Sequence, residues 1–170
     1  MSPVARLHIR ELAVFGLLAA LLCVSKFALS GLPNIEPVSL LLLLYTLSYG
    51  KKALYILYAW VLFEGLLYGF GQWFFSYLYV WLALWGLAML FRRRRGAVFW
   101  AVVSGFYGLL FGPLCALSWG VLHGPAAGFS YWVSGIPFDI AHAVGNFILA
   151  LLLFRPLRRA MDMVSRKLRP

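Results

Sequence analysis

The sequence predicts an all-α integral membrane protein with six transmembrane helices and both termini on the cytoplasmic side. Composition is the first reason, because hydrophobic residues make up 64% of the chain and charged residues 12%, against roughly 45–50% and 25% in soluble domains. The placement of the basic residues is the second. Of the 15 lysines and arginines, all except Lys26 lie in four clusters that separate long apolar stretches.

The four basic clusters predict the orientation of each span, because short cytoplasmic loops retain an excess of Lys and Arg. The clusters are Arg6 and Arg10, Lys51 and Lys52, Arg92 to Arg95, and a last group between Arg155 and Arg169. The connections that would lie on the other face, near residues 31–37, 69–72 and 123–134, contain no Lys or Arg. This alternation predicts six crossings.

Each expected span is an apolar stretch between these markers, since about 20 helical residues cross the hydrocarbon. In order, the spans are expected at residues 11–29, 38–49, 52–70, 73–91, 97–122 and 136–157. The second is too short to cross alone, so its outer end should be non-helical or lie inside a protein cavity. Residues 158–170 form a basic amphipathic tail, expected at the cytoplasmic interface or against a partner. The whole chain, residues 1–170, is expected to be one membrane domain.

Small residues recur at four-residue spacing in two spans. Gly16 and Ala20 share one face of the first span, with Ala19 beside them, and the fifth span carries a stripe of Gly108, Gly112, Ala116 and Gly120. Small residues let helices approach closely in lipid. The stripe in the fifth span predicts internal packing. In the first span, internal packing and docking onto another membrane protein both remain open.

The sixth span carries polar residues on one face. Asp139, His142 and Asn146 are spaced i, i+3, i+7 and therefore project from the same side of a helix. Polar groups inside a membrane seldom face lipid. Three interpretations are open for this face: ligand binding, a structural hydrogen-bond network, or proton coupling and chemistry.

Lys26 is the one basic residue outside the clusters. It could pair with Glu64, Asp139 or Glu36, or it could extend to the outer headgroups. Glu64 either lines a pocket or serves only in an ion pair. Asn34 and Glu36 belong to the first outer loop.

Aromatic residues complete the candidate site. Belts at the membrane interfaces explain most of them, but Trp81 is expected in the middle of the membrane. Flat rings beside a few polar groups suit a planar heteroaromatic molecule. The predicted substrate-binding residues are Lys26, Asn34, Glu36, Glu64, Tyr77, Trp81, Trp132, Asp139, His142 and Asn146.

Several classes of protein are disfavoured. The basic residues bracket apolar spans instead of lining a polar face, which argues against nucleic-acid binding. There is no HExxH, GxSxG or phosphatase motif, so no catalytic residue is assigned. Cys23 and Cys115 lack metal-ligand spacing and are interpreted as packing residues. No cofactor or metal is expected.

The chain resembles the substrate-binding S components of energy-coupling factor vitamin importers. The resemblance covers nearly the whole length and includes six helices, both ends inside, and no nucleotide-binding motif. Residues 16–20, GLLAA, resemble the AxxxA coupling face of that family, with Gly16 in place of the first Ala. The segments LPNIEP, residues 32–37, and GIPFDIAHAVGN, residues 135–146, resemble those of uncharacterised S components.

This resemblance implies a function, a location and partners. The protein would be a multi-pass subunit in a bacterial or archaeal cell membrane that captures a vitamin-like molecule from outside. A transmembrane T protein and two cytoplasmic ATPases would drive import. The loop from Gly31 to Pro37 would be a lid, and the face formed by Gly16, Ala19 and Ala20 would contact the T protein.

The substrate and the mechanism stay open at this stage. Three carboxylates against one lysine on the outer side favour a neutral or cationic ligand of the flavin, pyrimidine, pyridine or benzimidazole type. One alternative is a stand-alone carrier in which Asp139 and His142 couple transport to protons. Another is an intramembrane enzyme that uses the same two residues.

Overall fold

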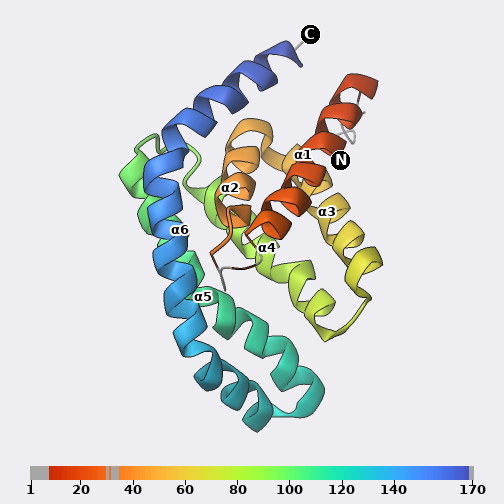
Figure 1. Ribbon diagram of the computed structural model, residues 1–170, viewed down its shortest axis with the longest axis vertical. Coiled ribbons are helices and arrows are strands. Elements are labelled where there is room, and N and C mark those ends of the chain that lie inside the picture. The colour runs from red at the N-terminus through yellow and green to blue at the C-terminus, as the bar shows by residue number, and fades with distance from the viewer. Residues whose placement is uncertain (1–7, 30, 32–34, 169–170) are drawn as a thin grey trace.

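The computed structural model describes residues 8–29, 31 and 35–168, and within these residues the secondary structure consists of helices alone. The elements are α1 (Ile9–Ala28), α2 (Val38–Tyr49), the 3₁₀ turn η1 (Gly50–Lys52), α3 (Ala53–Tyr68), α4 (Gln72–Leu90), α5 (Ala97–His123) and α6 (Pro125–Lys167). The all-α fold class is therefore confirmed, and Figure 1 shows the helices gathered into one bundle.

The helices are long and apolar enough for a multi-pass membrane protein. Five continuous helical stretches could each cross a membrane by length and composition: residues 9–28, 38–68, 72–90, 97–123 and 125–167. The stretch 38–68 contains both α2 and α3. Six separate crossings, and which side each end faces, stay predictions.

The described members of the four basic clusters lie at one end of the bundle. One cavity there is lined by Arg92, Arg95 and Arg158, and a second by Lys52 together with Glu11, the neighbour of Arg10. Figure 1 shows the start of α1 and the end of α6 at this same end of the molecule. We call it the basic end.

Helix α2 is short and central. Its side chains from Val38 to Thr46 are all buried, and its 12 residues correspond to about 18 Å of helix, less than the hydrocarbon thickness of about 30 Å. The chain then turns at Gly50, whose φ of 59° is a conformation that glycine adopts at little cost. The short second helix is thus as the sequence predicts, and other helices shield it from lipid.

Helix α6 corrects the prediction for the last third of the chain. Residues 123–134 were expected to form a loop, but the connection consists of Gly124, with φ of 93°, and a 43-residue helix follows. Proline at the first helical position is favourable, so Pro125 starts this helix and does not break it. Gly128 then packs against the backbone of α5 at Gly120. This glycine therefore allows two helices to approach closely and does not form a turn.

The tail expected at residues 158–170 is a continuation of α6 as far as Lys167. Pro156 lies inside the helix, where a missing N–H and a steric clash favour a bend. In Figure 1 the C-terminal part of α6 leans over the basic end toward the start of α1. Ser165 and Leu168 share a cavity there with Glu11 and Lys52. This part of α6 therefore packs on the bundle.

The glycine stripe of α5 packs against α6, as the sequence predicts. A Cβ at Gly108 would lie 2.6 Å from the Cα of Ala143, and a Cβ at Gly112 would lie 2.1 Å from Oδ2 of Asp139. Both distances are too short for real atoms, so only glycine allows this close approach. Helices in lipid associate largely through such packing.

We predict that Gly108→Ala destabilises the protein by about 1–3 kcal/mol, because the new methyl group must displace the backbone of α6. Gly86→Ala is the matched control, since a Cβ at Gly86 meets nothing within 4 Å and alanine favours a helix. Thermal unfolding of both variants in detergent measures the difference. Equal melting temperatures for the two variants would contradict the packing argument.

Candidate functional site

Lys26 turns inward from α1 and forms an ion pair with Glu64 of α3. The Lys26 side chain is 27% exposed and that of Glu64 is 2% exposed. The ammonium also lies 5.8 Å from the ring centres of Trp60 and Tyr68 and 5.2 Å from that of Tyr77. These are distances for cation–π attraction, so the pairing interpretation of Lys26 holds and the headgroup interpretation does not.

The local sequence explains this cage. Trp60, Glu64 and Tyr68 are spaced four residues apart on α3, so their side chains share one face of the helix. Glu36, half-buried just before α2, lies within electrostatic range of the same pair. Burial raises the pKa of Glu36, while the charge of Lys26 lowers it and that of Glu64 raises it further. The ammonium is thus paired with one carboxylate and lies within electrostatic range of a second carboxyl group.

Asp139 and His142 lie together on the buried face of α6. Oδ1 of Asp139 accepts a hydrogen bond from the backbone N–H of Gly112 at 3.0 Å. Its Oδ2 and both ring nitrogens of His142 are buried without a hydrogen-bond partner among the described residues. The absence of a side chain at Gly112 is what lets the carboxylate approach α5 so closely.

A layer of aromatic rings connects these two polar regions. We call Trp60, Tyr77, Trp81 and Phe111 the aromatic layer. The ring centres of Trp60 and Trp81 are 5.3 Å apart, those of Trp81 and Phe111 are 5.4 Å apart, and Phe111 lies 4.9 Å from His142. The layer therefore runs from α3 through α4 and α5 to α6.

The aromatic layer also carries polar atoms that lack partners. The indole N–H groups of Trp60 and Trp81 are buried and make no hydrogen bond to described residues. Together with Asp139 and His142, this gives five such atoms along one path of contacts. Buried polar atoms nearly always have a partner, so a cluster without one indicates a place for a ligand or water.

Helix α4 is fixed to α5 by a tyrosine that enters the backbone ladder of α5. The hydroxyl of Tyr79 donates to the carbonyl of Leu114 at 2.6 Å and accepts from the N–H of Ser118 at 3.2 Å. Those two backbone groups are four residues apart and would otherwise close a helical turn. This contact follows Pro113, and it holds α4, which carries Tyr77 and Trp81, in register with α5.

Other predicted site residues lie elsewhere or serve the fold. The amide of Asn146 donates to Ser39 at 3.1 Å and to the carbonyl of Ser104 at 3.3 Å, which supports the structural interpretation for this residue. Trp132 is exposed, contacts Phe129 and lines a groove of about 500 Å³ between α5 and α6. Asn34 lies outside the described residues, as does part of the expected lid.

The residues expected to contact a partner divide into two groups. A Cβ at Gly16 would meet nothing within 4 Å, and Ala20 is exposed. Ala19 is 7% exposed and belongs to the core. The open face of α1 therefore contains Gly16 and Ala20, and Ala19 packs inward.

Sequence reasoning missed Phe111 as a site residue and named Trp60 only as a neighbour of Glu64. Phe111 lies beside no polar residue in the sequence, so no local pattern marks it. Its role comes from the contact between α5 and α6. Trp60 could have been included, because it shares a helix face with Glu64.

No protein family, curated protein or solved structure matches the chain. The geometry alone therefore defines the class: a helical membrane protein with a buried layer of rings and unpartnered polar atoms. Within the described part of the chain, no group of three or more His, Cys, Asp or Glu residues is placed to hold a metal ion.

We predict strong coupling between Lys26 and Glu64. Lys26→Met alone should cost about 1–3 kcal/mol, because it leaves a buried carboxylate without its partner. Glu64→Gln combined with Lys26→Met should recover part of this loss. Thermal or chemical unfolding of both single variants and the double variant gives the coupling free energy. Strictly additive effects would contradict the ion pair.

Proposed function

We propose that this protein captures a vitamin-like heteroaromatic molecule from outside the cell and delivers it as the substrate-binding subunit of an ATP-driven importer. The observation that carries the proposal is the set of five buried polar atoms without partners along the aromatic layer. A planar ring with hydrogen-bonding groups at its edge could stack on the aromatic side chains and form hydrogen bonds with these atoms.

The site also suggests the charge of the ligand. Lys26 is already neutralised by Glu64. Glu36 lies within electrostatic range of this pair, and Asp139 is bonded to Gly112, the neighbour of Phe111 in the aromatic layer. A neutral or cationic ligand is thus favoured over an anionic one. Three cavities lined by described residues lie away from this layer.

The direction of capture follows from the basic end. Lys26 lies in the last turn of α1, and Glu64 lies near the end of α3. Both positions are far along their helices from the basic residues Arg10 and Lys52. If the basic end is cytoplasmic, as Lys and Arg favour, the ion pair lies toward the outside of the cell membrane.

Partner subunits are proposed from the exposed face of α1. Gly16 and Ala20 offer a smooth surface on which another helix could pack closely. A transmembrane T protein would occupy this face, and two cytoplasmic ATPases would supply energy. The resemblance to S components described above supports this assembly, and so does the absence of a P-loop motif from the sequence.

A second candidate function is a stand-alone proton-coupled carrier. It is favoured by one observation, the proximity on α6 of a carboxylate oxygen and an imidazole that both lack partners. Such a carrier would transport its substrate in liposomes without ATPases and would respond to a proton gradient. An S component would bind its substrate but give little energised uptake alone.

The test of the proposed function is to purify the full chain and identify co-purified small molecules by mass spectrometry. A panel of vitamins and precursors is then screened for thermal stabilisation. A heteroaromatic compound that co-purifies and raises the melting temperature would support the proposal. Recovery of lipid alone, with no stabilisation across the panel, would count against it.

We predict that Asp139→Asn, His142→Gln and Trp81→Phe each weaken binding of that compound at least tenfold. A buried hydrogen-bonding group of the ligand that loses its partner costs about 1–3 kcal/mol, and 1.4 kcal/mol is a factor of ten in Kd. Thr46→Val is the control, since Thr46 is buried in α2 and bonds only within its own helix. Unchanged affinity in all three variants would remove the aromatic layer as the binding site.

We predict the opposite behaviour for the open face of α1. Gly16→Leu and Ala20→Leu should retain binding, because Gly16 has free space around it and Ala20 is exposed, but they should abolish uptake in cells. Leu21→Phe is the control, since Leu21 is exposed and lies about 140° around the helix from Gly16. Normal uptake in the Leu variants would show that α1 docks no partner there.

A further inference from the structure

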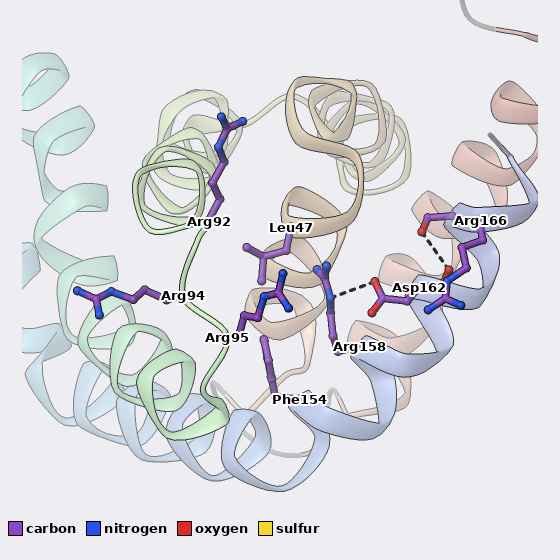
Figure 2. Close-up of a pocket in the computed structure, with 9 residues that line it drawn as sticks. Leu47, Arg92, Arg94, Arg95, Phe154, Arg158, Asp162 and Arg166 are labelled. Atoms are coloured by element: carbon purple, nitrogen blue, oxygen red, sulfur yellow. Dashed lines mark hydrogen bonds and ion pairs between the residues drawn. The ribbon is translucent and has the colours of Figure 1, made fainter. Parts of the chain in front are cut away.

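We propose that the cavity at the basic end is a binding site for a phosphate-bearing anion. This cavity, which we call the arginine cavity, has a volume of about 420 Å³. It lies between the end of α2, the α4–α5 loop and the C-terminal part of α6. Its charged lining consists of Arg92, Arg94, Arg95, Arg158, Arg166 and Asp162, and Figure 2 shows these side chains.

The charge balance of the arginine cavity favours an anion. Five arginines and one carboxylate line the cavity, and Asp162 is already bonded to Nε of Arg158 at 3.2 Å. Like charges that share a confined space repel one another. Bound anionic oxygens would convert this repulsion into attraction, and the planar fork of arginine matches phosphate geometry.

Arg158 supplies the second, independent observation. Its Nη1 atom is buried and has no hydrogen-bond partner among the described residues. Figure 2 shows the Arg158 side chain reaching toward that of Arg95, with Leu47 and Phe154 on either side of them. A donor held in such a place lacks both water and protein acceptors, which is the arrangement that an anion between the two guanidinium groups would satisfy.

The loop that supplies Arg95 is held in place before any ligand binds. The carbonyl of Arg94 accepts a hydrogen bond from the indole of Trp100 at 3.1 Å, and its N–H donates to Phe91 at 2.8 Å. The Arg94 guanidinium lies 5.8 Å from the ring of Phe99, and Figure 2 shows it pointing away from Arg95. Arg95 and Arg158 are therefore the main contacts of the anion.

Two sources could supply this anion: the headgroup of an acidic phospholipid and a soluble phosphate. The arginine cavity lies where α4 ends and α5 begins, with Leu47 and Phe154 as apolar neighbours. Basic pockets at the ends of transmembrane helices are suited to lipid headgroups. The chemistry is the same for both sources, and the experiment separates them.

The test uses the full chain in a neutral detergent and follows its melting temperature. Phosphatidylglycerol is added in mixed micelles, with phosphatidylcholine as the lipid control and inorganic pyrophosphate as the soluble probe. The variants are Arg95→Gln alone and Arg95→Gln with Arg158→Gln. Arg159→Gln with Lys167→Gln is the matched control, because it removes the same charge from exposed positions of α6 that do not line the cavity.

We expect phosphatidylglycerol to raise the melting temperature of the wild type and of the control variant. For the variant that lacks both Arg95 and Arg158, the lipid concentration that gives half-maximal stabilisation should be at least tenfold higher. Pyrophosphate that stabilises with the same dependence on Arg95 and Arg158 would assign the site to a soluble phosphate. Equal losses in the variant and the control, or no stabilisation by either probe, would overturn the proposal. Arg95→Gln alone leaves the Arg158–Asp162 pair intact and gives the same readout if the double variant does not fold.

Discussion

The ion pair between Lys26 and Glu64 is the contact on which the rest of the candidate site depends. A lone charge is costly inside an apolar bundle, so each of these residues requires the other. This pair fixes the C-terminal end of α1 to α3. A second ion pair, between Lys52 and Glu11 at 2.6 Å, fixes the N-terminal end of α1 to the turn before α3. Held at both ends, α1 can leave most of its outward face uncovered. A peripheral helix with a free face is what a docking role needs.

The same constraint shapes the interior between α3 and α6. Polar atoms there must be satisfied by protein, water or ligand. Asn146 finds protein partners on α2 and α5, whereas Asp139 and His142 leave three atoms unpaired. That difference separates a structural residue from candidate binding residues, although all three project from one face of one helix. The glycines of α5 make both arrangements possible by admitting α6 so closely.

The two proposed sites lie at different positions and differ in chemistry. The aromatic layer is built of rings, with few charges, and is suited to a flat organic molecule. The arginine cavity concentrates positive charge at the basic end and is suited to phosphate oxygens. The basic clusters thus have a structural consequence beyond orientation in the membrane, because the fold brings the cluster at Arg92 to Arg95 against the one on α6. Either site could be tested while the other is left intact.

The sequence by itself determined the helical class, the bounds of α2 and the packing stripe of α5, because apolar length, charge position and helical spacing are local properties. The binding role of the predicted site residues stays a prediction. The sequence could not reveal that residues 125–134 are helical, because the Gly and Pro residues there indicate a turn. Only the structure shows that Gly128 packs against Gly120 of α5. Tertiary structure decided which residue pairs with Lys26. It also decided that Phe111 belongs to the aromatic layer and that Trp132 lies apart from it. Each depends on which helices meet, and contacts between residues far apart in the chain leave no local pattern.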